Sequence, residues 1–374
     1  MLKRLTNLAK TILAVSWIRR AYEAATRGLL EVGAANRLTA TIYSLPGLVT
    51  FNREQYAVLR GRRDYYRNLT TARRTHVELR RNIHRLEKGL SMRPRRAVFA
   101  KDYLGETLDF YSRALDAAAA SDGGIDPGEL TWAHDVLAGY FETVDHTDPV
   151  VAAAHTRFKQ VPLPAGTDRL VDARSNGATN AGPFARRDGV VSDVGYEQLK
   201  APAEQRRSVR WFLDRPVPRE LVDQALLVGR QSPSACNRQP YEFLVFDDPE
   251  LVAKVASIPN GTAGYSHQIP TVVVVKGKLD SYFSPRDRHV IYIDSALAAM
   301  GFMYALETLG LASSPINWPD FEPLEAKMAA TLGLGPSERV IMLIAVGYAD
   351  PDGIIPFSQK KSLDVLRSYN ALPE

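Results

Sequence analysis

Apolar residues at helical spacing dominate the first part of the chain. One stripe, with members at i, i+4, i+7 and i+11, is formed by Leu79, Ile83, Leu86 and Leu90. A second stripe of the same spacing is formed by Leu104, Leu108, Tyr111 and Leu115. Asp126 and Pro127 supply an N-cap and a first-turn proline for a third helix, which ends near Val144. These patterns predict that residues 1–145 form an all-helical module.

Residues 146–195 lose this periodicity. Glycine and proline accumulate there, at Pro162, Pro164, Gly166, Gly177, Gly182, Pro183 and Gly189. Such a stretch is typical of a linker or an extended arm, and we place a domain boundary in it.

Short apolar runs alternate irregularly with helical patterns in residues 196–374. The predicted strands are Tyr241 to Phe246, Thr271 to Lys276, and Val340 to Tyr348. Helices are predicted over about 219–230, 248–257 and 290–310. Because no regular strand–helix–strand rhythm is present, the pattern predicts an α+β domain and not a doubly wound sheet.

Charge is divided unevenly along the chain. Residues 1–100 carry 21 Lys and Arg against 6 Asp and Glu, whereas the whole chain has a net charge of only +5. On the helix after residue 77, the basic side chains are Arg80, Arg81, His84, Arg85 and Lys88. This face is either solvated or binds nucleic acid, lipid headgroups or an acidic partner. No nucleic-acid motif accompanies it, so nucleic acid is the least expected of these partners.

An apolar patch, Thr11 to Ile18, lies close to the N-terminus between basic residues. It is too short to span a bilayer. One interpretation is an amphipathic helix packed on the protein, which we favour because such stripes usually face a core. The other is a helix lying on an anionic membrane surface, with Lys3, Arg4, Lys10, Arg19 and Arg20 toward the headgroups.

The chain contains one cysteine, Cys236. It therefore has no internal disulfide and no multi-cysteine metal site, which fits a reducing compartment. The seven histidines are scattered, and no metal site is expected. We expect a cytoplasmic protein, with a peripheral position at the inner face of a membrane as the alternative. Cys236 lies among small residues without a nearby histidine, so we interpret it as a space-filling residue and not a nucleophile.

Three separated segments have the chemistry to bind one planar anion. Two or three guanidinium groups and a hydroxyl within residues 206–210 can clamp a phosphate. In residues 232–240, small side chains permit close backbone approach, while Asn237 and Gln239 can hydrogen-bond a heterocycle edge. Lys360 and Lys361 supply further cations near the C-terminus. No Rossmann fingerprint, P-loop, zinc-binding or serine-elbow motif is present.

The order of these segments resembles the nitroreductase family of FMN-dependent oxidoreductases. The resemblance covers about residues 195–370. Its motifs are Arg206-Arg207-Ser208-Val209-Arg210, Pro233-Ser234-Ala235-Cys236-Asn237-Arg238-Gln239-Pro240-Tyr241-Glu242-Phe243, Leu309-Gly310-Leu311 followed by Pro315-Ile316, Ala345-Val346-Gly347-Tyr348, and Lys360-Lys361-Ser362-Leu363. The family's fold implies a central, mainly antiparallel sheet flanked by helices.

The resemblance also implies roles for single residues. Arg206 and Ser208 would grip the FMN phosphate and ribityl chain, with Arg207 beside them. Arg210 would face the pyrimidine edge of the flavin. The loop residues that would cover the ring from a partner subunit are Pro233, Ser234 and Asn237, with Gln239 in the same motif. Backbone amides of Ile316 and Asn317 would lie near N5 and O4, and Lys360, or else Lys361, would complete the phosphate site. The family often has Gly where Trp318 stands and Arg where Lys360 stands.

The implied activity is that of a homodimeric enzyme with FMN at the interface. It would pass hydride from NAD(P)H through flavin N5 to a small electron-poor acceptor, such as a nitro compound, quinone or enone, by a ping-pong mechanism. The cofactor carries such a reaction, so no protein residue is named as catalytic. The alternative is a flavin-fold scaffold with little turnover, docked by its basic helical half to a membrane surface or an acidic protein.

Overall fold

A computed structural model describes residues 15–45, 48–69, 75–120, 125–162, 181–370 and 372. The chain forms two compact units. One comprises residues 1–56 with 320–322, and the other comprises residues 57–319 with 323–374. Residues 1–14, the expected turn at 121–124 and the central part of the expected linker, 163–180, lie outside the described residues.

The first unit contains helices α2 (Ser16–Ala34) and α3 (Arg37–Ser44) and the start of α4 (Leu48–Asn68). Asn36 caps α3, because its side-chain oxygen accepts from the amides of Leu38 at 2.9 Å and Thr39 at 3.1 Å. Trp17 is 66% exposed and Leu29 is 61% exposed. Within this unit these two side chains of α2 are uncovered. Residues 11–14 of the apolar patch singled out in the sequence lie outside the described residues, so the packed and the membrane-surface interpretations both stay predictions.

A helical module in the second unit consists of α5 (Val77–Leu90), α6 (Lys101–Ala120), α7 (Pro127–Thr143) and α8 (Pro149–Phe158). The predicted stripes are confirmed, since Leu79, Leu104 and Leu108 are fully buried in one cluster. The predicted cap is also present, with Asp126 Oδ1 accepting from the Gly128 amide at 2.9 Å. Helix α8 lies inside the expected linker, where its apolar residues complete the same cluster.

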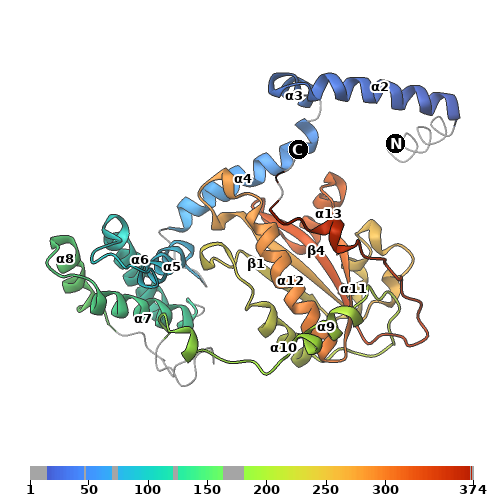
Figure 1. Ribbon diagram of the computed structural model, residues 1–374. Helices are drawn as coiled ribbons and strands as arrows, with labels where there is room; N and C mark the ends of the chain where they lie inside the picture. The colour runs from blue at the N-terminus through green and yellow to red at the C-terminus, as the bar shows by residue number, and fades with distance from the viewer. Residues whose placement is uncertain are drawn as a thin grey trace. The chain divides into compact units, whose positions relative to one another are not determined.

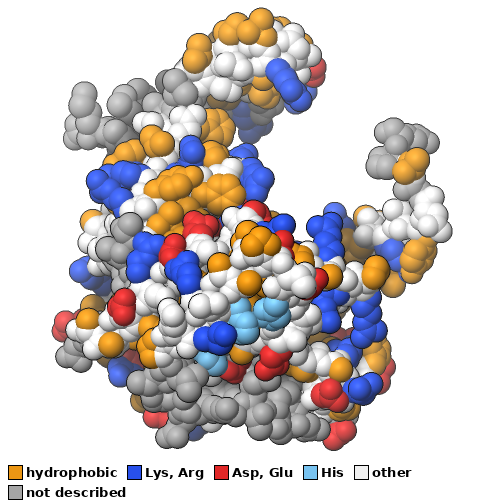
Figure 2. Space-filling model, turned by 90° about the vertical axis from the view of Figure 1, so that its left-hand side faces the viewer, with side chains coloured by type: hydrophobic (Ala, Val, Ile, Leu, Met, Phe, Trp, Pro, Cys, Tyr) orange, Lys and Arg blue, Asp and Glu red, His pale blue; other side chains and the backbone are white. Residues whose placement is uncertain are grey.

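Basic side chains are interspersed with other kinds of side chain on the one face of the molecule seen in Figure 2. Hydrophobic, acidic and histidine side chains lie between the Lys and Arg side chains there. Many are paired locally: Arg81 with Glu78, and Arg85 over the Tyr103 ring at 3.5 Å.

A four-stranded antiparallel sheet forms the centre of the second unit (Figure 1). Its strands are β1 (Tyr241–Phe246), β2 (Thr271–Lys278), β3 (Ala312–Asn317) and β4 (Glu338–Gly347), in the order β1-β2-β4-β3. The α+β class and the mainly antiparallel sheet predicted from the sequence are confirmed. Strand β3 was not predicted, because it contains Pro315 and polar residues and lacks an apolar run.

Helices cover both faces of the sheet. The helices of this part of the chain are α9 (Tyr196–Gln205), α10 (Arg219–Gly229), α11 (Pro249–Ala256), α12 (Val290–Thr308), α13 (Glu322–Leu332) and α14 (Leu363–Leu366). Helices α10 and α12 pack with Val273 and Ile344 on one face. Helices α11 and α13 pack with Val274 and Leu343 on the other. Short 3-10 turns lie at Arg186–Asp188, Ala235–Asn237 (η2), Asn260–Thr262, Ser266–Gln268, Leu279–Ser281 and Pro285–Asp287.

Helix α12 runs along the sheet in close contact with α10 (Figure 1). Gly229 permits this approach, because a Cβ there would lie 2.9 Å from the Ala298 carbonyl oxygen. Among the described residues, the stretch Pro285–Thr308 is long and apolar enough to cross a membrane, but half of it is buried inside the protein. Its buried members, among them Ile291 and Phe302, belong to the core of the sheet domain. We therefore regard α12 as a core helix.

Candidate functional site

The predicted phosphate clamp lies along the free edge of the sheet. Helix α9 ends at Gln205, and the chain then runs beside β3, where Ser208 pairs with Ser313. The Val209 amide donates to the Ser313 carbonyl oxygen at 3.1 Å. This pairing fixes the backbone of residues 206–210, so that their side chains radiate from a rigid base.

A carboxylate of α12 stands beside the two leading arginines. Gln205 Nε2 donates to Glu307 Oε2 at 3.2 Å. Burial raises the pKa of the Glu307 carboxyl, and the charges of Arg206 and Arg207 partly oppose this rise. The site thus places two cations against one half-buried carboxyl group. It has excess positive charge for a phosphate dianion.

Arg210 stands at the far end of the clamp and is exposed. Its carbonyl oxygen accepts from Gln268 Nε2 at 2.7 Å, and its guanidinium carbon lies 6.0 Å from the centre of the Tyr265 ring. The hydrogen bond fixes the backbone at Arg210, and the exposed guanidinium group can still contact the edge of a planar ligand.

The two amides predicted to face the cofactor differ in direction. In an extended strand the N–H and C=O of one residue point to the same side, and successive residues alternate. Ser313 directs its carbonyl outward to Val209, so Pro315 and Asn317 also face the open edge. Ile316 faces β4 and pairs with Leu343 there. The geometry therefore supports Asn317, and not Ile316, as an amide donor to a ligand.

Trp318 is packed in the core of the sheet domain. The residue is 8% exposed, and its Nε1 donates to Glu325 Oε1 at 2.6 Å. Glu325 in turn lies 3.7 Å from Arg339 Nη2. The large side chain at this position fills the space between β3 and α13.

The predicted ring-covering loop adopts a strained conformation. Three non-glycine residues have left-handed backbones, with φ of 54° at Cys236, 52° at Asn237 and 48° at Gln239. Within the loop, Ser234 Oγ accepts from the Gln239 amide at 3.1 Å, and Asn237 Oδ1 accepts from Gln239 Nε2 at 3.0 Å. Pro233 lies directly before Ser234, at the start of the loop. These internal bonds give the side chains of Ser234, Asn237 and Gln239 a structural role in the loop.

Two residues outside the loop hold it in place. Asp294 of α12 accepts from the Ala235 amide at 3.0 Å, and burial raises the pKa of its carboxyl. Arg80 of α5 donates through Nε to the Asn237 carbonyl oxygen at 2.9 Å. Sequence reasoning missed both, because Asp294 is a scattered acidic residue in an apolar helix and Arg80 belongs to a basic face that was left open between a solvated and a partner-binding role. Glu307 was missed for the same reason as Asp294.

One chain does not bring all the predicted residues together. The clamp arginines, Arg206 and Arg207, lie near Glu307, and the loop contacts Asp294. Glu307 and Asp294 are 13 positions apart on helix α12. At 1.5 Å per residue this separation is about 20 Å. Lys360 and Lys361 lie in the exposed tail after β4, where Gln359 Nε2 donates to the Lys360 carbonyl oxygen at 2.9 Å.

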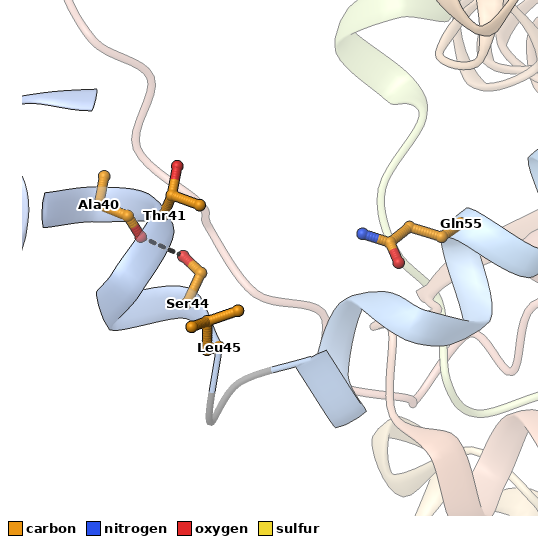
Figure 3. A pocket seen from close by; sticks show the side chains of 5 residues that line it. All are labelled: Ala40, Thr41, Ser44, Leu45 and Gln55. Atoms are coloured by element: carbon orange, nitrogen blue, oxygen red, sulfur yellow. Dashed lines mark hydrogen bonds between the residues drawn. The ribbon is translucent and has the colours of Figure 1, made fainter. Parts of the chain in front are cut away.

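Two surface hollows occur elsewhere. One, of about 320 Å³, lies between α3 and α4 and is lined by Ala40, Thr41, Ser44, Leu45 and Gln55 (Figure 3). The other, of about 260 Å³, is in the helical module and is lined by Leu108, Ser112, Leu115, Asp116, Arg157, Gln160, Val161 and Pro162. Neither contains a residue predicted to bind the cofactor. Among the described residues, no group of three or more His, Cys, Asp or Glu is arranged to hold a metal ion.

Comparisons with known proteins concern the second half of the chain. The model of the nitroreductase family matches residues 203–263 and 259–348. A protein of Archaeoglobus fulgidus named "Putative NADH dehydrogenase/NAD(P)H nitroreductase" is 30% identical over 153 residues, which are 38% of this chain and 80% of that protein. Iodotyrosine deiodinase 1 of Pongo abelii is 23% identical over 200 residues, 45% of this chain and 66% of its own length.

The chain thus spans just under two thirds of the deiodinase. Among solved structures, an FMN-dependent nitroreductase of Clostridium difficile has 20% identity and a TM-score of 0.40, covering 46% of this chain and 98% of its own. A Parabacteroides distasonis protein has 22% identity and a TM-score of 0.42, covering 47% of this chain and 99% of its own.

Proposed function

The chain belongs to the nitroreductase family, and on this premise we propose that it is an FMN-dependent oxidoreductase. It would take hydride from NAD(P)H and pass it through the flavin to an electron-poor small molecule by a ping-pong sequence. When bound, FMN supplies the two-electron chemistry, and the protein supplies binding, orientation and electrostatics.

The chain's own residues divide this work along the edge of β3. Arg206, Arg207 and Ser208 bind the phosphate, since guanidinium groups and a hydroxyl match its oxygens. Arg210 stabilises negative charge at the pyrimidine edge of the ring. The outward amide of Asn317 donates a hydrogen bond to the ring. Lys360, or else Lys361, adds a cation at the phosphate.

The observation that carries this proposal is the shared edge. Ser208 pairs with Ser313, and Asn317 lies four residues further along the same strand. This corresponds to about 13 Å of extended chain, long enough to hold a phosphate at one end and a ring at the other. The hydroxyl of Ser313, which lies on the same face of β3 as Asn317, is buried and has no hydrogen-bond partner among the described residues, which also suits a polar ligand.

Anaerobic reduction tests the proposal. The full chain is purified, loaded with FMN and mixed with NADH or NADPH without oxygen. We expect flavin absorbance that at least one nicotinamide bleaches and that an acceptor restores. A protein that refuses FMN contradicts the cofactor assignment. A yellow protein that neither nicotinamide reduces contradicts the oxidoreductase and leaves a flavin-fold scaffold.

An acceptor screen then defines the substrate class. It includes a nitroaromatic, a quinone and an enone. Because deiodinases are among the relatives, it also includes an iodinated phenol. The ratio of kcat/KM values between these compounds identifies the preferred chemistry.

We also propose a homodimer with FMN at its interface. The separation of about 20 Å between clamp and loop supports this, because a second chain can place its loop over the first chain's clamp. Apolar side chains near the loop are also available for such a contact: Leu227, Val228, Ile293 and Leu297 are exposed. Light scattering on an eluting chromatographic peak is expected to give twice the chain mass of 41.4 kDa.

A second proposal concerns location: a cytoplasmic protein held at the inner face of a membrane by its first unit. On α2, the side chains of Tyr22, Leu29 and Val32 fall within one arc of about 80° at 100° per residue and are 60–67% exposed. Arg20 and Arg27 fall on the opposite arc. An aromatic–aliphatic face opposite arginines is typical of helices that lie in an anionic interface.

Vesicle sedimentation tests this location. The full chain is expected to sediment with vesicles that contain phosphatidylglycerol, and less with pure phosphatidylcholine. Replacing Leu29 and Val32 by alanine removes about 3 kcal/mol of apolar burial, and should weaken partitioning more than tenfold. The control is Leu213→Ala, an exposed leucine outside this unit. Equal sedimentation of all three proteins would contradict the proposal, and salt-sensitive capture by an acidic protein alone would favour the other partner class.

A further inference from the structure

The loop of residues 233–239 requires external support. Left-handed backbone at non-glycine residues is unfavourable and persists where surrounding contacts over-determine it. Here three such residues occur within four positions, at Cys236, Asn237 and Gln239. The sheet domain holds the first part of the loop through Asp294, which accepts from the Ala235 amide at 3.0 Å.

The second part of the loop is held from the helical module. Arg80 Nε donates to the carbonyl oxygen of Asn237, the central left-handed residue, across 157 positions of sequence. Helix α5 and the η2 turn are accordingly in direct contact. A bond to this carbonyl restrains the peptide plane that follows Asn237, and therefore the backbone angles at that residue.

Arg80 is itself held rigidly for this contact. Its Nη1 lies 2.9 Å from Glu129 Oε2 on α7, and its guanidinium carbon lies 5.3 Å from the centre of the Trp132 ring. Glu129 is buried and also accepts from the His76 amide at 2.9 Å. The Arg80 side chain is only 14% exposed. Few conformations remain open to it, so the Nε–H direction is fixed before any ligand arrives.

We propose that Arg80 is a positioning residue for the flavin, and that through it the helical module (residues 77–158) is part of the cofactor site. This module lies outside the residues that the family model matches. The inference deepens the proposed function and depends on it, because the loop is assigned to the flavin. Without Arg80, the bond to the Asn237 carbonyl is lost. Residues 233–239 then no longer keep, in the absence of FMN, the left-handed conformation proposed to cover the ring.

The test compares two arginines of the same helix in the full-length chain. Arg80→Met removes the bond to the loop and keeps an apolar stem over Trp132. Arg85→Met is the matched control, because Arg85 contacts Asn82 at 3.1 Å and the Tyr103 ring at 3.5 Å, both within the module. Two readouts are measured: FMN affinity by quenching of flavin fluorescence, and hydrogen exchange of the residue 233–239 amides in the protein without FMN.

We expect Arg80→Met to weaken FMN binding by about tenfold to a hundredfold, the effect of losing a charged hydrogen bond. Loop amide exchange should accelerate by at least about tenfold. Arg85→Met should change both readouts less than threefold. Arg80→Lys keeps the charge opposite Glu129 but lacks a planar second donor, so it should retain the fold and still lose the loop effect.

The outcomes separate this inference from the function on which it rests. If the unaltered protein binds FMN, and both Arg80 variants match it in affinity and loop exchange, Arg80 has no positioning role. If Arg80 and Arg85 variants accelerate exchange equally throughout the chain, the effect is general destabilisation and the inference fails. If the unaltered protein does not bind FMN, the proposed function fails, and loop exchange still decides whether Arg80 holds the loop.

Discussion

The strongest single-residue expectation concerns Arg206. Its side chain stands beside Arg207 and the raised-pKa carboxyl of Glu307, on backbone fixed against β3. Arg206→Ala removes one charged hydrogen-bond donor and leaves only Arg207 to offset the charge of the Glu307 carboxylate. FMN binding should weaken by about 1.5–3 kcal/mol, measured by fluorescence titration. Arg219→Ala, which breaks the ion pair with Asp247 on a different surface, is the control. Unchanged FMN affinity in Arg206→Ala would remove this residue from the site.

Trp318 provides the opposite kind of prediction, one of stability without loss of binding. The indole N–H bonds Glu325 in the core, and Glu325 also faces Arg339. Trp318→Phe keeps most of the ring but leaves a buried carboxylate with one fewer donor. The free energy of unfolding should fall by about 1–3 kcal/mol in urea titration, with FMN affinity unchanged. A variant with native stability and altered affinity would instead place Trp318 in the pocket.

At the scale of a helix, His76 makes the helical module sensitive to acid. It caps α5, with Nδ1 accepting from the Leu79 amide at 3.1 Å. Burial lowers the pKa of His76 below its ordinary value of 6.5, and the nearby Glu129 opposes this only in part. A lowered folded-state pKa means that stability is complete above about pH 6.5. It is lost as pH falls through the folded-state pKa, because the unfolded chain binds the proton first.

The measurement is the melting temperature between pH 7.5 and 5. The unaltered protein should lose stability below pH 6.5, whereas His76→Asn should keep a cap and show a flatter profile. Burial also lowers the pKa of His155, so His155→Asn is the control for the remaining slope. Identical profiles for the unaltered protein and His76→Asn would assign the acid sensitivity elsewhere.

Helices and strands whose apolar residues recur at a regular spacing could be predicted from the sequence. Elements whose conformation depends on pairing with a distant segment could not. The stripe that begins at Leu79 and the valine-rich strand β2 have patterns that one conformation satisfies. Strand β3 contains Ser313, Ser314 and Pro315, so its strand character comes from pairing with β4. Arg80 shows the same limit at the site, because its bond to Asn237 links positions that no local pattern connects.

The arrangement of the whole molecule is tested by mixing two defective chains. The clamp residues Arg206 and Arg207 lie near Glu307, whereas Ser234 and its loop lie near Asp294 at the other end of the long helix. If each flavin site uses the clamp of one chain and the loop of its partner, an Arg206→Ala/Arg207→Ala chain and a Ser234→Trp chain are each unable to bind FMN alone. A mixed dimer contains one site with both defects and one site with neither.

Co-expression of the two chains in equal amounts makes half of the dimers mixed, so FMN occupancy should recover to about one quarter of the unaltered value. The measurement is flavin absorbance per chain after purification, with each variant expressed alone as the control. Sites built within one chain give a different result, since every chain then carries a defect in its own site. Occupancy that stays at the level of the single variants would therefore refute the shared site, and would require clamp and loop to close on one another within a single chain.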